Sequence, residues 1–346
     1  WQICNCKIMR THKRYITFLF SLFLTLGQAQ NPDIVSRVAT SAANWLKIET
    51  GTKAIGMGGA FTSMPGGITG IPYNPSSVTF VDGQEGFFST TRYFADITHN
   101  VLGYGTNMSG VDFAAAHIFF LDSGSIGVTT EQFPEGTGET YHFTGLCFRG
   151  TYGKIITNRL RIGFTGKYIR ESIHTTFMES FALDIGSHFD TGLWGFKLGM
   201  SINNLGPEVK FEGDGLQIEC TEAASTVCNL VTESFRLPLT FRLGFSNEII
   251  GSQSKLVESE NHGLVVAFDA INPIDYTMYY AVGLEYSLRD MFFVRAGTHL
   301  EHDTAELSLG AGIEFNIRDY RFGMDYAFVN YGILDYTHQF GLNFEF

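Results

Sequence analysis

The sequence predicts an all-β protein, a transmembrane antiparallel β-barrel of about fourteen strands. Three observations support this. Past residue 30, no apolar run approaches the roughly 18–20 residues that a membrane-spanning helix needs. From Glu85 to the last residue, segments of about nine to twelve residues alternate apolar and polar side chains, as strands with one apolar face do. With 39 Gly, 32 Phe and only 17% charged residues, the composition fits neither a disordered protein nor a coiled coil.

Residues 1–30 are predicted to be upstream residues and a secretory signal peptide. After Met9 come Arg10, Lys13 and Arg14, then an apolar stretch, and then small residues that suit cleavage after Ala29. The apolar stretch is too short to span a bilayer as a helix. This region carries four basic and no acidic residues, so without it the net charge falls from −12 to −16. A protein this acidic lacks the basic surface that binds nucleic acid, so no nucleic-acid partner is expected.

Residues 31–82 differ from the rest because they show no clean alternation. A short helix is expected near residues 41–47, with Ser41 as its N-cap. A glycine-rich stretch, residues 51–77, follows. Its Gly-Met-Gly-Gly run at residues 56–59 is not expected to bind phosphate, since no Lys-Ser or Lys-Thr pair follows it and no strand precedes it. A plug or a close approach between backbones explains these glycines better.

Residues 83–346 are predicted to form the barrel. Fifteen segments alternate, but a single-chain barrel with both ends in the periplasm needs an even number of strands. One segment is therefore not a barrel strand, and we expect it among the first four. The segments are residues 86–94, 99–108, 111–121, 125–132, 139–150, 159–172, 178–189, 194–204, 236–247, 263–272, 277–288, 291–301, 305–316, 320–330 and 336–346.

The apolar face of each segment is expected to meet lipid, and the polar face an aqueous lumen. Leu309 and Phe322, for example, lie on apolar faces, and Ser308 lies on a polar face. The polar faces carry mostly Gly, Ser, Thr and Asn, aromatic residues gather near strand ends, and the chain ends on Phe346. These features are typical of outer-membrane barrels. A secreted soluble β-protein, in which the apolar face is a core, is the alternative.

A periplasmic C-terminus would place the long connection at residues 205–235 outside the cell and make residues 248–262 an unusually long periplasmic turn. Either that turn folds locally or the strand count slips there. Cys220 and Cys228 lie in the outer connection, where an exported protein can form a disulfide. No metal site is expected there, because no histidine or second cysteine pair lies at ligand spacing. Cys147 is expected to be a small buried hydrophobic residue.

The glycine-rich segment carries a family resemblance. Its motifs are Leu46-Lys47-Ile48, Gly51, Ala54, the run Gly56-Met57-Gly58-Gly59-Ala60-Phe61, and the turn Asn74-Pro75. Their order resembles the N-terminal region of the PorV/PorQ-type outer-membrane proteins, and residues 199–207 and 322–328 resemble later parts of the same family. Three places depart from the family pattern: Pro65-Gly66-Gly67 where acidic residues are usual, Ser76 in the turn, and Lys53 where Arg is common.

The resemblance implies a FadL-like barrel of fourteen strands in the outer membrane of a Gram-negative, Bacteroidetes-like bacterium. It also implies that residues 31–82 fold into the lumen as a plug. Characterised relatives act in type IX secretion, where they bind the translocon or receive cargo, whereas FadL itself moves hydrophobic molecules across the outer membrane. Two functions therefore remain open, beside a structural barrel with a filled lumen.

As an accessory of protein secretion, the chain would bind a large translocon or secreted cargo proteins through its outer connection. The contact candidates are Leu216, Ile218, Leu230, Val231 and Phe235. As a transporter of small hydrophobic molecules, it would pass them along the plug and the luminal side chains. The candidates for the plug and the ligand path are Met57, Gly58, Gly59, Phe61, Met64, Asn74 and Pro75.

No enzyme activity and no cofactor are expected. The sequence has no Gly-x-Ser-x-Gly nucleophile elbow, and its histidines are scattered. His299, Glu301 and Asp303 form one local cluster, which is expected to be a polar strand tip and not a metal or catalytic site. Outer-membrane lipid is the partner expected in either function.

Overall fold

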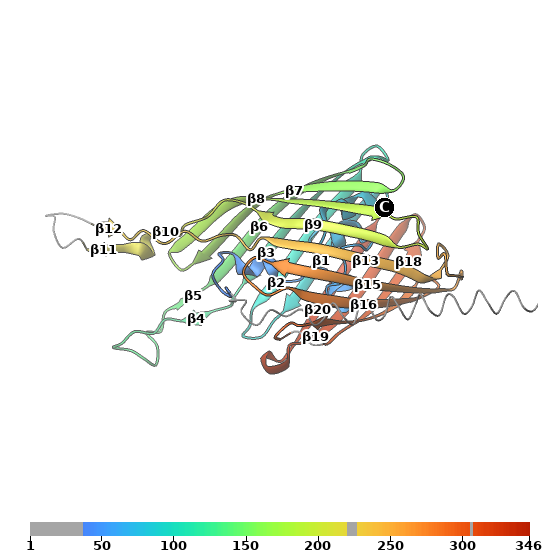
Figure 1. Cartoon of the computed structure of the whole chain (residues 1–346). Coiled ribbons are helices and arrows are strands. Elements are labelled where there is room, and N and C mark those ends of the chain that lie inside the picture. Colours follow the sequence, from blue (N-terminus) through green and yellow to red (C-terminus); the bar gives the residue numbers. More distant parts are fainter. Residues whose placement is uncertain (1–36, 220–226, 305–306) are drawn as a thin grey trace, which may run out of the picture. The chain divides into compact units, whose positions relative to one another are not determined.

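The computed structural model describes residues 37–219, 227–304 and 307–346. The predicted signal peptide, residues 1–30, lies outside the described residues. So do the first residues of the predicted plug. The remainder of the chain can be followed from the N-terminal segment through the whole barrel (Figure 1).

Fourteen strands of the described residues form a closed antiparallel barrel, which confirms the predicted fold class and strand number. Each strand pairs with the next one around the barrel, and the last strand closes the sheet by pairing with the first, from Glu85 opposite Glu345 to Arg92 opposite His338. The strands are β1 (Gln84–Arg92), β2 (Thr98–Asn107), β3 (Asp112–Asp122), β6 (Phe143–Ile155), β7 (Leu160–Ile173), β8 (Thr176–Asp190), β9 (Lys197–Leu205), β13 (Thr240–Gly251), β15 (His262–Pro273), β16 (Tyr279–Leu288), β17 (Phe292–Leu300), β18 (Leu307–Ile317), β19 (Tyr320–Asn330) and β20 (Tyr336–Glu345).

The surplus segment is residues 125–132, the fourth of the fifteen, which is not a barrel strand. Its paired part is β4 (Ile126–Gly127), which forms a small hairpin with β5 (Thr140–Tyr141) away from the barrel wall (Figure 1). The chain between β4 and β5 contains Pro134 and two glycines, and proline cannot donate to a strand ladder. The alternation in this segment therefore ends before a spanning strand can form.

Several strands begin later than predicted, and for two of them the cause is local. The strand expected at residues 236–247 starts at Thr240, because Pro238 has no N–H to donate to the ladder. The strand expected at residues 194–204 starts at Lys197, because Trp194 takes part in a turn with a positive φ of 49°. The local conformation thus delays the start of both strands, and β13 is shifted along the chain, not shortened, because it continues to Gly251.

The helix predicted near residues 41–47 is only a 3₁₀ turn, η1 (Asn44–Lys47), and the predicted N-cap is wrong. Ser41 instead forms a parallel bridge with Arg236, whose carbonyl accepts a hydrogen bond from the Ala42 N–H. This pairing holds the chain extended and delays the helical turn until Asn44.

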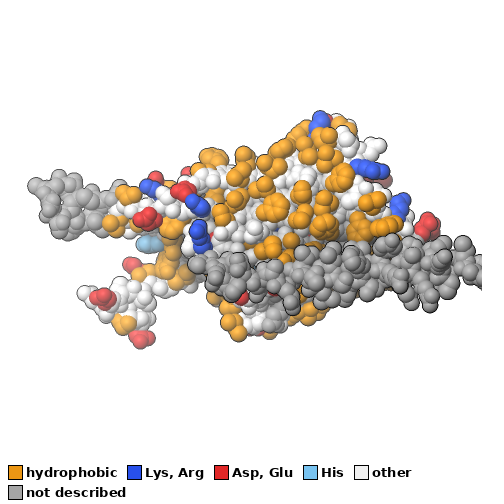
Figure 2. All heavy atoms as spheres, viewed as in Figure 1, with side chains coloured by type: hydrophobic (Ala, Val, Ile, Leu, Met, Phe, Trp, Pro, Cys, Tyr) orange, Lys and Arg blue, Asp and Glu red, His pale blue; other side chains and the backbone are white. Residues whose placement is uncertain are grey.

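The alternating side chains face as predicted. Leu309 points outward and is 45% exposed, whereas its neighbour Ser308 points inward and is 2% exposed. Phe322 lies on the outer face, where its ring packs against those of Phe315 and Phe344. Figure 2 shows hydrophobic side chains spread over the barrel wall. Outward apolar and inward polar positions are the pattern of a barrel in lipid.

The N-terminal segment, residues 37–82, packs against the inward faces of the strands. After η1 it forms three short turns, α2 (Thr52–Gly56), α3 (Gly67–Gly70) and η2 (Pro75–Phe80). Trp45 and Val78 share a buried cluster with Phe119 of the wall. Inward glycines allow the close approach: a Cβ at Gly297 would lie 2.1 Å from the carbonyl carbon of Met57. The segment therefore occupies much of the interior.

The two ends of the barrel differ. The short-turn end carries Phe346 and connections such as residues 156–159 and 318–319, whereas the long-loop end carries residues 123–142 and 206–239. The predicted long connection at residues 205–235 belongs to the long-loop end, where it forms β10 (Glu212–Gly213), η3 (Asp214–Leu216), β11 (Gln217–Glu219) and β12 (Val227–Asn229). The connection between β19 and β20, at the same end, contains η4 (Gly332–Leu334).

The long turn predicted at residues 248–262 does fold locally. Strand β13 continues to Gly251, and β14 (Val257–Glu258) folds back to pair with it in parallel. The strand count is therefore not disturbed there. None of the helices in the described residues is long and apolar enough to cross a membrane.

Candidate functional site

An apolar cavity of about 590 Å³ lies at the long-loop end. Trp45 of η1 and Ile48 form one side of it, and Tyr279 at the start of β16 lies on another. The wall and the connections add Tyr93, Phe94, Ile97, Leu121, Phe143, Tyr331 and Leu334. A concave, mostly apolar cavity with a few polar groups suits a small hydrophobic molecule.

The polar groups of this apolar cavity include a close contact between a carboxylate and an imidazole. Glu49 Oε1 lies 3.3 Å from His299 Nε2. Burial alone would raise the pKa of Glu49, but His299 and then Arg242 lower it below its ordinary value. His302, in the connection after β17, meets the ring of Tyr279 edge-on at 4.9 Å. Burial, assisted by His299, lowers the pKa of His302 below its ordinary value, which favours the neutral imidazole.

The residues of the polar cluster predicted at the tip of β17 lie in two different environments. His299 turns to Glu49 inside the cavity, whereas Asp303 accepts a hydrogen bond from the Tyr276 hydroxyl at 2.5 Å on the exposed surface. In the described part of the chain, no group of three or more His, Cys, Asp and Glu side chains is arranged to hold a metal ion.

A much smaller polar cavity, of about 30 Å³, adjoins the apolar cavity. The two share Lys47, Ile48 and Glu49 as lining residues. The polar cavity is otherwise lined by Leu46, Thr50, Pro72, Tyr73, Arg149, Lys167, Asn203, Asn204, Thr240 and Arg242. Its volume corresponds to about one water molecule.

On the outer wall, beside this polar cavity, runs an apolar groove of about 780 Å³. Its floor is a row of small outward residues on neighbouring strands, Ala116 opposite Gly150 and Gly150 opposite Gly166. A Cβ added at Gly150 or Gly166 would meet no atom within 4 Å. Large residues border the groove: Ile118, Phe148, Tyr168, Phe181, Leu183 and Leu205. Arg149 and Lys167 line both the groove and the polar cavity.

The sheet is irregular at the end of this groove. The register between β8 and β9 shifts after Leu183, so that Asp184 faces a bulge at Asn204, whose φ is +64°. Asp184 accepts a hydrogen bond from the Asn204 N–H at 2.7 Å and forms an ion pair with Lys167 at 2.6 Å. Side chains thus replace ladder hydrogen bonds, and beyond Leu205 the chain leaves the wall.

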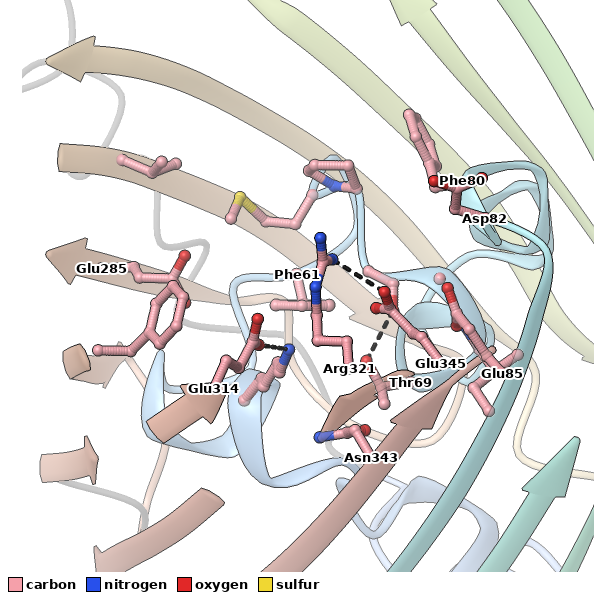
Figure 3. Close-up of a pocket in the computed structure, with 18 of the residues that line it drawn as sticks. Phe61, Thr69, Phe80, Asp82, Glu85, Glu285, Glu314, Arg321, Asn343 and Glu345 are labelled. Carbon is pink, nitrogen blue, oxygen red and sulfur yellow. Dashed lines mark hydrogen bonds and ion pairs between the residues drawn. The ribbon is translucent and has the colours of Figure 1, made fainter. Parts of the chain in front are cut away.

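A fourth cavity, of about 320 Å³, lies at the short-turn end and is strongly charged. Figure 3 shows Glu285, Glu314, Arg321 and Glu345 around it, with ion pairs from Lys53 to Glu314 (2.6 Å) and from Arg321 to Glu345 (2.8 Å). Burial would lower the pKa of Lys53, but the carboxylates of Asp325 and Glu314 raise it. Such a cavity suits a polar solute or water better than an apolar molecule.

The residues predicted for the ligand path lie in different places. Phe61 and Met64 line the charged cavity. Met57 is fully buried in an apolar cluster that also contains Phe61 and Met64, and Gly58 and Gly59 have φ values of 61° and 73° that suit glycine. Asn74 caps η2 through the Ser76 N–H and donates to the carbonyls of Thr62 and Ser187; Pro75 follows at the first position of the turn. Their role in a ligand path remains a prediction.

The predicted contact residues of the outer connection also differ from one another. Leu230 and Val231 are 51% and 80% exposed, whereas Leu216 is half-buried. Phe235 packs its ring against Phe211 and joins the buried cluster, so it offers little free surface. Ile218 pairs with Cys228 between β11 and β12 through the backbone.

The predicted disulfide cannot be placed, because Cys220 lies outside the described residues. The pairing of Cys220 with Cys228 therefore stays a prediction. Cys147 is fully buried and free, as predicted.

The sequence did not single out the residues between the cavities. Trp45, Arg149, Lys167, Asn204 and Arg242 are not among the predicted site residues. The charged residues on the predicted inward faces could have indicated such a region, since buried charges need partners. The partners follow from cross-strand register, which alternation within one strand does not give.

No protein-family model matches the sequence, and no curated protein matches it. Solved structures match the fold. The toluene transporter TodX of Pseudomonas putida superposes with a TM-score of 0.56 at 13% identity, over 86% of this chain and 97% of that one. The toluene transporter TbuX of Ralstonia pickettii gives 0.56 at 10% identity over 86% and 98%, and a FadL homologue of Pseudomonas aeruginosa gives 0.51 at 10% over 85% and 97%. At such identities the likeness shows the fold.

Proposed function

We propose that the protein is a Gram-negative outer-membrane barrel that takes up small hydrophobic molecules at the cell surface and releases them through its wall into the outer membrane. The observation that carries the proposal is the series of adjoining cavities, from the apolar cavity through the polar cavity to the outer groove. Two structures of the same fold are named toluene transporters, which supports a hydrophobic cargo.

The first step is capture. The apolar cavity lies at the long-loop end, which faces the cell exterior when the C-terminus is periplasmic. Trp45, Tyr279 and Tyr331 offer aromatic faces to a ligand. Burial of apolar surface, worth roughly 25 cal/mol per Å², favours transfer of a hydrophobic molecule from water into this cavity.

The second step is lateral passage. The N-terminal segment fills the axis of the barrel, and the cavity at its other end is charged. A hydrophobic molecule therefore has a poor path straight through. Towards the wall, one small polar cavity, which also carries charged side chains, lies between the apolar cavity and the groove. The bulge at Asn204 and the ion pair of Lys167 with Asp184 are the elements that must move to open this passage.

The role in protein secretion, predicted from the sequence resemblance, has no counterpart among these solved structures. Translocon and cargo partners therefore gain no support. Leu230 and Val231 remain exposed on the outer connection, but scattered exposed hydrophobic residues are common and do not identify a partner.

Filling the outer groove tests the proposal. Gly166→Leu adds a side chain to open space on the groove floor, so the barrel should fold while the exit is obstructed. Ala311→Leu is the matched control, an equally apolar enlargement on the outer face of β18, away from the groove. We expect Gly166→Leu to reduce uptake of radiolabelled toluene by whole cells several-fold and Ala311→Leu to leave it unchanged. Equal uptake by both variants at equal outer-membrane levels would contradict the lateral route.

A further inference from the structure

The small polar cavity contains an unusual concentration of buried cations. Arg149 on β6 lies directly opposite Lys167 on β7, and both side chains point inward. Arg149 is 6% and Lys167 is 4% exposed. Arg242 of β13, 7% exposed, reaches the same cavity from the other side. Like charges directly opposite one another on neighbouring strands destabilise a sheet unless an anion compensates them.

Compensation within the described residues is incomplete. Lys167 has Asp184 as its ion-pair partner at 2.6 Å, but neither arginine forms an ion pair with a described carboxylate. Arg149 lies over the ring of Phe119 at 3.8 Å, and Arg242 lies over that of Tyr73 at 5.1 Å. Aromatic faces offset part of a buried charge. Arg149 Nε and Arg242 Nη1, however, have no hydrogen-bond acceptor among the described residues.

The carboxylates of Glu49 and Asp269 attract Arg242 but also bind other groups. Glu49 lines the polar cavity, but its Oε1 lies 3.3 Å from His299. Asp269 accepts the N–H groups of Phe61 and Thr62 at 3.0 and 2.9 Å. A water molecule in the cavity could accept the two free donor hydrogens. It would still leave the charge of Arg149 without a carboxylate partner among the described residues, whereas Arg242 is attracted by Glu49 and Asp269. Isolated buried charge is too costly to remain so.

We propose that the polar cavity binds one small inorganic anion of about the size of chloride, held by Arg149, Arg242 and Lys167. The volume of about 30 Å³ is enough for one particle of this size. The site follows from charge and hydrogen bonding alone, although its cavity lies on the passage proposed above.

Two measurements on the full-length protein in detergent test the site. In the first, the unfolding temperature is followed at constant ionic strength as sodium chloride replaces sodium gluconate, whose anion is too large for the cavity. Chloride should raise the unfolding temperature by about 2–4 °C and saturate. The double variant Arg149→Gln with Arg242→Gln should lose this response. Arg161→Gln is the matched control, since Arg161 also points inward but already donates to the Thr79 carbonyl at 2.6 Å.

In the second measurement, crystals grown in sodium bromide should show an anomalous peak between Arg149 and Arg242 of the unaltered protein, whether or not the variants fold. No peak, together with equal stability in chloride and gluconate, would overturn the site. A peak without any chloride-dependent stability would mean an adventitious ion only and would also overturn it. Density that continues from the arginines into the apolar cavity would also overturn the site, because it would show the charged head of an amphiphile and not a small inorganic anion. Neither experiment measures hydrocarbon uptake, so a result that overturns the anion site does not contradict the transport proposal.

Discussion

In the described barrel strands, neighbouring residues face opposite sides of the wall, one towards lipid and the next towards the lumen. Leu309 and Ser308 are adjacent in sequence, yet 45% of one and 2% of the other are exposed. This assignment was predictable from the sequence, because the side chains of a strand alternate with period two. The charge partners of inward residues were not predictable, because Arg149 and Lys167 become neighbours only through the register of β6 and β7.

The facing assignment predicts different effects of a new cation at an outward and at an inward position. Leu309→Arg places a charge against lipid and should cost roughly 2–4 kcal/mol if it lies near the bilayer centre. Asn343→Lys places one in the charged cavity, where Asn343 already donates to Asp325 at 2.9 Å. It should be tolerated. Ser308 is a poor control, since it is too tightly buried for a large side chain. Urea unfolding in lipid vesicles would measure both, and equal losses would contradict the assignment.

Glu49 is expected to give a pH-dependent contribution to stability. Its pKa is lowered in the folded protein from an ordinary value of 4.5, so its stabilisation is present above that pH and is lost as the pH falls through the lowered value. Glu49→Gln should therefore be less stable than the unaltered protein at pH 6, and the difference should shrink below pH 4.5. Thermal unfolding from pH 6 downwards checks this. A difference that grows as the pH falls would show that the sign is wrong.

At the scale of elements, short turns of the N-terminal segment pack against inward-facing glycines of the barrel wall. Gly297 lies against Met57 and Gly58, and Gly199 lies against Thr62 and Ser63. The glycine-rich sequence predicted a close backbone approach, but not which strands it would contact. Such contacts are between residues more than a hundred positions apart, and a single sequence does not record them.

The seating of this segment predicts a result for two glycine variants. Gly297→Val puts atoms where the Met57 backbone lies, whereas Gly166→Val puts them into open space. Overpacking costs typically about 1–3 kcal/mol, so Gly297→Val should loosen the segment while the barrel persists. Limited trypsin digestion near Lys53 should therefore be faster in Gly297→Val than in Gly166→Val. Equal digestion rates would mean that the segment does not depend on this contact.

At the scale of the whole molecule, the fold was predictable in class, strand number and approximate strand limits, and the surplus segment lay among the first four as expected. What could not be predicted was the arrangement of cavities. The groove exists because Ala116, Gly150 and Gly166 fall in one cross-strand row, and the bulge at Asn204 exists because β9 leaves the wall after Leu205. Both features depend on pairing between strands.

The most direct test of hydrocarbon uptake is removal of the gene followed by two measurements on the same cells. We predict that the deletion strain loses saturable uptake of radiolabelled toluene at micromolar concentrations, that the unaltered gene restores it, and that the set of secreted proteins is unchanged. Unchanged uptake together with an altered set of secreted proteins would contradict the account and favour a role in secretion.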